Sequence, residues 1–136
     1  MPFTFSCPVR WDDMDAFGHV NNVTFLIYMQ EARTAMLFAG EASEQIPELI
    51  KGVVVARHEI DYRRPLEWRP EPIEIDMWTA DIKSSSFIVR YKIRDQLAGA
   101  VLADAMTVLV PFDLTAARPR RLAHNERKFL ERYLEP

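Results

Sequence analysis

Carboxylates gather in the stretch RWDDMDAFGHVNN, residues 10–22, where they are candidates for nucleophilic or general acid–base chemistry. Asp12, Asp13 and Asp15 lie within four positions, and a histidine and two asparagines follow before a mainly apolar run begins. A carboxylate can attack a carbonyl carbon directly or act as a general base toward water. Either route also needs a donor for the negative charge on the carbonyl oxygen, and the free amides of a helix N-terminus are such donors.

The apolar run VTFLIYMQEARTAMLFAG, residues 23–40, predicts a helix. It lacks alternation of period two, reaches helix length and ends at Gly40, a common C-terminal cap. Asn21 or Asn22 suits the N-cap position. Apolar residues occupy most of the circumference, so we expect a helix that is buried rather than lying on a surface.

Asp15 lies about seven residues upstream of this helix start, so one loop can present a carboxylate and a helix amide to the same substrate. We expect the amide near Asn22 to bind the carbonyl oxygen and Gly18 to let the chain approach closely. Removing one such donor typically costs about 2.7–4 kcal/mol of transition-state stabilisation. Acids before a helix more often cap it or favour its dipole, and we keep this reading for Asp12 and Asp13, with Asp13 a candidate for orienting the loop.

Later segments alternate with period two and predict strands. A first strand is expected within residues 3–9, and the others within residues 52–66, 72–82, 86–95 and 98–112. We expect the last four to form a meander. In the first of these four, His58 alternates with apolar residues, which predicts a buried, hydrogen-bonded histidine. Residues 41–52 suggest a short helix or a loop, and residues 125–134 an amphipathic terminal helix.

This order predicts an α+β fold, with one antiparallel sheet of about five strands wrapped round one long central helix. The length of 136 residues suggests a single domain, residues 1–136. Trp78, Ile88 and the long last strand are apolar on the second face of the sheet as well. We therefore expect another subunit to cover part of that face.

Composition excludes several classes of protein. The net charge of −3 argues against a nucleic-acid module that relies on bulk charge. No run approaches the roughly 18 apolar residues of a membrane span, and the first residues lack a signal-peptide pattern. With Cys7 as the single cysteine, no internal disulfide is possible, and we expect a cytoplasmic protein.

Metal and serine chemistry find little support. The three histidines, His19, His58 and His124, are scattered, and with one cysteine they give no metal-ligand spacing. We expect no metal, and an exposed His124. The Gly-x-Ser-x-Gly pattern of serine hydrolases does not occur, and the serines at residues 84–86 have the composition of a turn.

The N-terminal quarter of the chain resembles a known family. VRWDDMDAFGHVNNVTFLIYMQEAR, residues 9–33, is similar to the signature of hotdog-fold acyl-CoA thioesterases of the 4-hydroxybenzoyl-CoA thioesterase type. There a short strand precedes an Asp-x-Asp loop, Gly-x-Val, and a long helix that ends in an Ala-Arg pair. The matching residues here are Asp13-Met14-Asp15, Gly18-His19-Val20 and Ala32-Arg33. EIDYRRPL, residues 59–66, also resembles the family's second strand and its exit.

The resemblance implies a helix wrapped by an antiparallel sheet, and homodimers or homotetramers with active sites at the subunit interface. It implies no metal and no separate cofactor, since coenzyme A is part of the substrate. The family's catalytic carboxylate falls on Asp15. The turn that contains Ser85 corresponds to one near the pantetheine and nucleotide, which implies a binding role for Ser85.

Two departures from related patterns matter. Many relatives carry a Gly-Asp pair where this chain has EWRPEP, residues 67–72. The His-Val-Asn-Asn form also occurs in plant acyl-carrier-protein thioesterases, where the histidine aligned with His19 works with an asparagine. This chain has Phe17 in that asparagine's place, so the full arrangement does not transfer. His19 stays a candidate for lining the site.

Coenzyme A carries phosphates, so the chain should offer local arginine or lysine side chains. Among several candidates we select Arg63 and Arg64. The first hypothesis is an acyl-CoA thioesterase that uses Asp15 as nucleophile or general base. The alternative is a hotdog protein that binds acyl-CoA without turnover; a hotdog dehydratase and a purely structural homo-oligomer fit the sequence less well. Aryl and aliphatic acyl groups both remain open, as do coenzyme A and a carrier protein as the thiol.

Overall fold

The computed structural model describes residues 1–39 and 52–136, and the short helix or loop expected at residues 41–52 lies outside the described residues except for Gly52. The described elements are β1 (Phe3–Cys7), the 3-10 turn η1 (Trp11–Asp13), α1 (Asn22–Phe38), β2 (Val53–Tyr62), β3 (Ile73–Ala80), β4 (Phe87–Asp95), β5 (Ala100–Asp113), β6 (Arg118–Pro119) and α3 (His124–Glu131).

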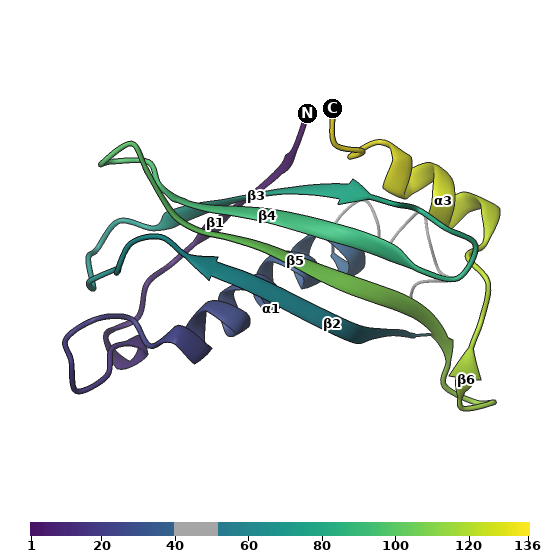
Figure 1. Ribbon diagram of the computed structural model, residues 1–136, viewed down its shortest axis with the longest axis horizontal. Coiled ribbons are helices and arrows are strands. Elements are labelled where there is room, and N and C mark those ends of the chain that lie inside the picture. The colour runs from purple at the N-terminus through teal and green to yellow at the C-terminus, as the bar shows by residue number, and fades with distance from the viewer. Residues whose placement is uncertain (40–51) are drawn as a thin grey trace.

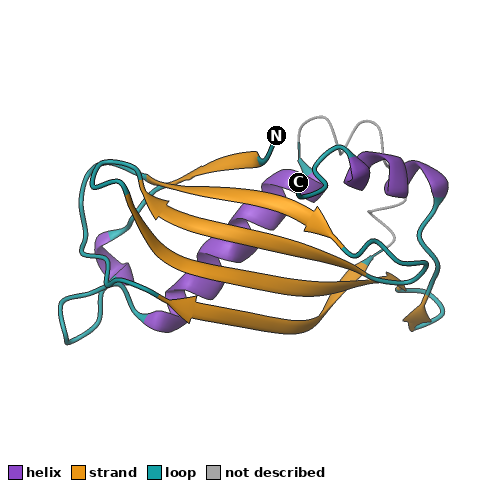
Figure 2. Ribbon diagram, turned by 45° about the horizontal axis from the view of Figure 1, so that its top comes forward, coloured by secondary structure: helices purple, strands orange, loops and turns teal. Residues whose placement is uncertain are grey.

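The strands form one antiparallel sheet in the order β1-β3-β4-β5-β2, with the two-residue β6 paired to β5. Helix α1 runs diagonally across one face of this sheet (Figures 1 and 2). This confirms the predicted fold class, a hotdog fold in which the sheet curves round one long helix.

The predicted meander is wrong in one respect. Strands β3, β4 and β5 do follow one another as neighbours, but β2 pairs with β5 at the far edge rather than with β3. The connection from Arg63 to Pro72 contains three prolines and is too long for a tight hairpin. It therefore carries the chain from one side of the sheet to the other.

The core lies between α1 and the inner face of the sheet. Side chains of β3 and β4 alternate between buried and partly exposed, as period two predicts. The fully buried ones include Ile75, Met77 and Phe87, which pack with Met29 and Met36 in the same cluster. Each such side chain contributes roughly 1.5–3 kcal/mol through its burial. This packing fixes the position of α1, and hence of its N-terminus, relative to the sheet.

Helix α1 is not buried all round, contrary to the sequence-based expectation. Val23, Ile27 and Phe38 are 56%, 42% and 40% exposed. The reason is geometric, because the sheet covers only one side of the helix. The opposite side, where these apolar residues lie among polar ones such as Gln30 and Glu31, is open among the described residues.

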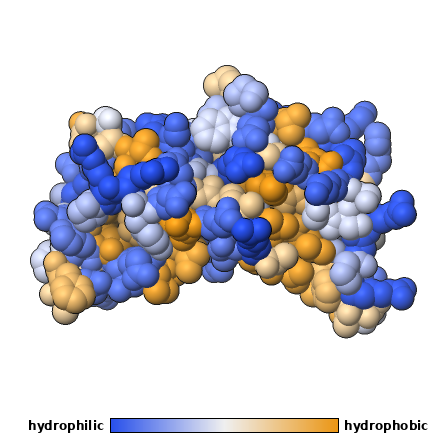
Figure 3. All heavy atoms as spheres, viewed as in Figure 1, coloured by the Kyte–Doolittle hydropathy of each residue, from blue (hydrophilic) through white to orange (hydrophobic). Residues whose placement is uncertain are grey.

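Strand β2 is open on both faces, so the prediction of a buried His58 is wrong. His58 is exposed at an edge of the sheet, and its Nδ1 lies 2.9 Å from Thr107 Oγ1. Partial burial, together with the charge of Arg33, lowers the pKa of His58. Hydrophobic side chains lie among hydrophilic ones along the side of the molecule where β2 runs (Figure 3). Val55 and Tyr62 of this strand are both exposed.

The C-terminal segment closes the end of the sheet opposite the N-terminus of α1 (Figure 1). The predicted terminal helix is confirmed as α3, with Phe129 and Leu130 buried. It ends at Glu131, so Leu134 lies beyond it and is half exposed. His124 is exposed, as expected. No helix in residues 1–39 or 52–136 is long and apolar enough to cross a membrane.

Candidate active site

Asp13 anchors the acidic loop to the core. Its carboxylate is 3% exposed and accepts hydrogen bonds from the Arg10 backbone amide at 2.9 Å and from Tyr28 Oη at 2.6 Å. Arg10 Nη2 also donates to it at 3.0 Å. Burial alone would raise the pKa of the Asp13 carboxyl, but the bonds from Tyr28 and Arg10 outweigh it and hold this pKa below its ordinary value. Since Tyr28 belongs to α1, Asp13 fixes the loop relative to the helix.

The Asp13→Asn variant tests this anchor. We expect its free energy of unfolding near neutral pH to fall by about 1–3 kcal/mol, because a buried charge-assisted network is broken. The native pKa lies below the unfolded one, so the Asp13 contribution is complete above the ordinary value of 3.8 and disappears as the pH falls through the lowered value. Thermal melting of both proteins from pH 2 to 7 measures the difference. If the difference in stability between the wild type and Asp13→Asn did not become smaller at low pH, this account would be contradicted.

Asp15 caps a tight turn two residues after Asp13. Its Oδ1 accepts from the Phe17 amide at 2.9 Å, and its carbonyl oxygen accepts from the Gly18 amide at 3.0 Å. Gly18 has φ +77°, a left-handed conformation that glycine adopts without strain. The turn returns the chain so that the Asp15 amide donates to the His19 carbonyl oxygen at 3.0 Å. One carboxylate oxygen, Oδ2, is thereby left facing the helix start.

Asn21 joins Asp15 to the helix. Its side-chain Nδ2 donates to Asp15 Oδ2 at 2.9 Å, while its Oδ1 accepts from the Val23 amide at 2.8 Å. It is therefore the N-cap of α1, one of the two predicted alternatives. Its carbonyl oxygen also accepts from the Thr24 amide at 2.9 Å. A single amide side chain thus holds the carboxylate and the first turn of the helix in one rigid arrangement.

The amide of Asn22 is the open donor of this first turn. Asn21 takes the amides of Val23 and Thr24, whereas no acceptor in residues 1–39 or 52–136 takes the amide of Asn22. The carbonyl oxygen of Asn22 accepts from Tyr62 Oη at 2.7 Å, which ties this residue to the end of β2. An unpaired amide at the positive end of a helix dipole suits an oxyanion.

A groove of about 310 Å³ opens beside this amide. Four of the predicted site residues line it, namely His19, Asn22, Arg63 and Arg64, together with Phe25 and Tyr62. Asp15 is not among its lining residues, although Asn21 holds it at the helix start. The groove is lined both by the residue that carries the open helix amide and by two arginines, a combination suited to an anionic ligand.

The two arginines differ in their pairing. Arg63 Nε donates to Asp104 Oδ2 at 3.0 Å, so its charge is already partly balanced. The guanidinium of Arg64 has no hydrogen-bond or ion-pair partner in the part of the chain that the structure describes. Arg64 is therefore the better placed of the two to bind a phosphate.

Ser85 lies apart from the other predicted site residues. It belongs to the turn between β3 and β4, and this turn lies at the opposite end of the sheet from the N-terminus of α1 (Figure 1). The neighbouring backbone pairs with the chain before α3, where the Leu122 amide donates to the Ser84 carbonyl oxygen at 2.9 Å. Within one chain, Ser85 and Asn22 cannot contact the same small group.

His19 lines the groove with its side chain 43% exposed. Its Nε2 lies 3.8 Å from Glu67 Oε1, too far for a hydrogen bond, and the Glu67 side chain is 78% exposed. Such an exposed pair contributes little to stability. His19 thus lies in the groove beside the open amide, and its contact with Glu67 does not fix its side chain.

Several residues of this site were not found from the sequence. The contacts of Tyr28 with Asp13 and of Tyr62 with Asn22 join positions far apart in the chain, and no local pattern reports them. The sequence identified Asn21 as one of two candidate N-caps, but it did not predict the hydrogen bond from Asn21 to Asp15. In the described ranges, no group of three or more His, Cys, Asp or Glu side chains could hold a metal ion.

Known proteins match this chain over nearly its whole length. A family model described as the thioesterase-like superfamily matches residues 9–129. The long-chain acyl-CoA thioesterase FadM of Escherichia coli (strain K12) is 28% identical over 127 residues, which are 93% of this chain and 96% of that protein. A thioesterase from Thermus thermophilus, solved in complex with coenzyme A and Zn, is 30% identical with a TM-score of 0.79, and the match covers 98% of this chain and 95% of that one.

A likeness at lower identity supports the fold alone. A predicted thioesterase from Bacillus stearothermophilus superposes with a TM-score of 0.86 at 22% identity, over 99% of this chain and 98% of that one. The family match includes the acidic loop, the start of α1 and every strand after it in the described ranges. The chain therefore belongs to the thioesterase-like superfamily and is a thioester hydrolase.

Proposed function

We propose that the protein is an acyl-CoA thioesterase of the 4-hydroxybenzoyl-CoA thioesterase type, with Asp15 as its catalytic carboxylate. One observation carries the proposal: Asn21 holds the Asp15 carboxylate at 2.9 Å and also caps the helix whose Asn22 amide is left open. In the proposed reaction, the thioester carbonyl oxygen accepts from the Asn22 amide. In one route Asp15 attacks the carbonyl carbon, the thiolate leaves, and water then hydrolyses the resulting anhydride to the free acid and the regenerated carboxylate. In the other route Asp15 removes a proton from the attacking water, and the thiolate leaves and takes up a proton.

The rest of the groove supports coenzyme A as the thiol. Arg63 and Arg64 supply positive charge beside the open amide, and the groove of about 310 Å³ has the size of a small-ligand site. The Thermus thermophilus thioesterase with 30% identity was solved with coenzyme A, which agrees with this assignment. His19 completes the proposed binding surface, while Gly18, which is not among the residues lining the groove, shapes the turn that precedes it. Coenzyme A belongs to the substrate, and the proposal needs no metal and no separate cofactor.

The binding role predicted for Ser85 requires a site shared between subunits. In one chain Ser85 is remote from Asn22, so a role for both at one substrate requires a second copy of the protein. We propose a homodimer or homotetramer with active sites at the subunit interface, in which the turn at Ser85 reaches the groove of a neighbouring copy. The buried Cys7, which forms no disulfide, is consistent with our proposal of a cytoplasmic location.

A thiol-release assay tests the proposed function. The purified protein is given a panel of aryl and aliphatic acyl-CoA esters, and the matching acyl-pantetheine thioesters serve as controls. We expect release of free coenzyme A from at least one class of ester, with saturation kinetics. Binding of acyl-CoA by calorimetry without any thiol release would support the non-catalytic alternative and overturn the proposal.

Arg64 provides a specific prediction for coenzyme A. We expect Arg64→Ala to raise KM for acyl-CoA by roughly 10- to 100-fold, because a charge-assisted hydrogen bond to phosphate contributes about 1.5–3 kcal/mol. Arg63→Ala should have a smaller effect, since Asp104 already pairs with Arg63. Lys92→Ala, an exposed cation on the outer face of the sheet, is the matched control. Equal losses with acyl-CoA and acyl-pantetheine would argue against phosphate contact.

A further inference from the structure

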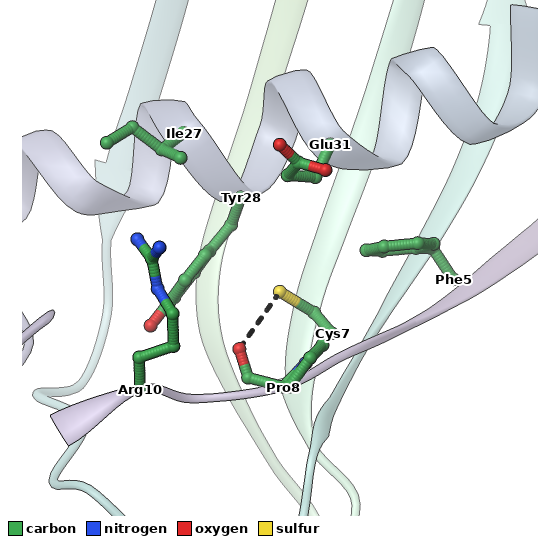
Figure 4. Close-up of a pocket in the computed structure, with 7 residues that line it drawn as sticks. All are labelled: Phe5, Cys7, Pro8, Arg10, Ile27, Tyr28 and Glu31. Atoms are coloured by element: carbon green, nitrogen blue, oxygen red, sulfur yellow. Dashed lines mark hydrogen bonds between the residues drawn. The ribbon is translucent and has the colours of Figure 1, made fainter. Parts of the chain in front are cut away.

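A second cavity of about 330 Å³ lies between β1 and the first half of α1. Phe5 and Cys7 line it from β1, and Ile27 and Tyr28 line it from the helix (Figure 4). None of its lining residues lines the groove beside Asn22. Its size falls in the range of small-ligand pockets. We call it the β1–α1 cavity.

The charges at its rim favour an uncharged occupant. Arg10 and Glu31 are the two charged residues that line it. The Arg10 guanidinium is already bound to the buried Asp13, while Glu31 would repel an anion. Burial, followed by the nearby charges of Asp13 and Glu31, raises the pKa of the Cys7 thiol to about 12, so this thiol is neutral. The cavity therefore suits neither a phosphate nor a free carboxylate, and its walls suit hydrocarbon.

The cavity lies within reach of the open amide along the outer side of α1. Val23 and Ile27 are four positions apart, so they lie on one side of the helix, and both are exposed although apolar. Along the axis, Ile27 and Glu31 lie roughly 8–14 Å beyond Asn22, at 1.5 Å per residue. A group that begins at a carbonyl carbon beside Asn22 and ends in the cavity must therefore be long and flexible.

We propose that the β1–α1 cavity binds the distal part of a linear, uncharged acyl chain, with Val23 and Ile27 as the apolar path that leads to it. This rests on the proposed function, because the chain must start from a thioester at Asn22. The cavity therefore favours medium and long aliphatic acyl thioesters over short ones and over esters with an aromatic ring directly on the carbonyl. The proposed likeness to the 4-hydroxybenzoyl-CoA thioesterase type then concerns the loop carboxylate and not the acyl group. A short acyl group bound at Asn22 ends before the cavity and gains nothing from it.

Narrowing the cavity at its rim tests the proposal. In Ile27→Trp, a bulky ring should block the cavity; Leu97→Trp, at an exposed apolar position in the turn between β4 and β5, is the matched control. For the wild type we expect kcat/KM to rise from butyryl- to decanoyl- and dodecanoyl-CoA. Ile27→Trp should lower the values for the two long esters about tenfold or more, since buried methylenes contribute about 0.8 kcal/mol each. Ile27→Trp should change kcat/KM for butyryl-CoA less than twofold. The control, Leu97→Trp, should leave kcat/KM unchanged for all three esters.

A second measurement does not depend on turnover. Decyl-CoA, a thioether that cannot be hydrolysed, should bind the wild type more tightly than free coenzyme A does, and Ile27→Trp should remove that advantage. Ile27→Ala, which widens the rim, should shift the preferred chain to greater length. An unchanged chain-length profile and unchanged decyl-CoA affinity in both variants would overturn the cavity proposal and leave the thioesterase proposal standing. A wild type that releases no thiol from any ester would overturn the proposed function instead.

Discussion

Asp15→Asn is expected to lower kcat for acyl-CoA hydrolysis by at least about 10²- to 10⁴-fold, the usual contribution of a positioned general base. The change keeps the size of the side chain and an oxygen for the Phe17 amide, so the turn should persist. It removes the negative charge that attacks the carbonyl carbon or activates water. The thiol-release assay measures kcat, and calorimetry with coenzyme A measures whether binding is retained.

Asp12→Asn is the matched control for this prediction. Asp12 is an exposed acid three positions away in the same loop, and the substitution is chemically the same. We expect its kcat to stay within about twofold of the wild type, as for most surface substitutions. Circular dichroism and thermal melting establish that both variants are folded. If Asp15→Asn retained full turnover, or if the two variants lost activity equally, Asp15 would not be the catalytic carboxylate.

Asn21→Asp is expected to produce the second large effect, through positioning. The new side chain keeps an oxygen that can cap the Val23 amide, but it places a second carboxylate against Asp15 Oδ2. Because two adjacent carboxylates resist ionising together, the acid limb of the kcat/KM profile should move up by about one pH unit or more. Activity at neutral pH should fall as a consequence. Rates measured from pH 4 to 9 reveal the shift.

Asn21→Ser separates charge from geometry. Serine is also a good N-cap, so the helix start should remain stable, but its hydroxyl is too short to reach Asp15 as the amide does. We expect a lower kcat, with the acid limb of the pH profile displaced less than in Asn21→Asp, because no second charge is introduced. If instead Asn21→Asp showed the wild-type profile and rate, the 2.9 Å contact between Asn21 and Asp15 would have no role in catalysis.

The central helix and the inner strands were predictable because their signals are local. The apolar run has helix length and a suitable N-cap at Asn21, although the helix ends at Phe38, before the predicted Gly40. The alternation in β3 and β4 assigns Ile75 and Phe87 to the core. The position of β2 was not predictable in this way. Which strand pairs with which depends on contacts distant in sequence, and the prolines between Arg63 and Pro72 gave the only hint of a crossover.

In the candidate site too, features with local signals were predictable from the sequence and long-range contacts were not. The acidic turn, Gly18 and the open amide at Asn22 follow from residue types within one stretch. Burial was not predictable in this way. His58 alternates with apolar neighbours, yet it is exposed, because β2 is an edge strand with no second neighbour in the described chain. The bond from Tyr28 to Asp13 likewise depends on how α1 packs against the loop, which no spacing in the sequence encodes.

The anchor at Asp13 has a consequence for the dynamics of the site. The acidic loop is bound to a buried tyrosine of the central helix, the Asn21 amide donates to the Asp13 carbonyl oxygen at 2.9 Å, and the Val20 amide donates to the Leu66 carbonyl oxygen at 2.7 Å. Local opening of the loop would have to break these contacts together. We therefore expect the loop to open together with the core rather than on its own, and to hold this geometry before a ligand binds.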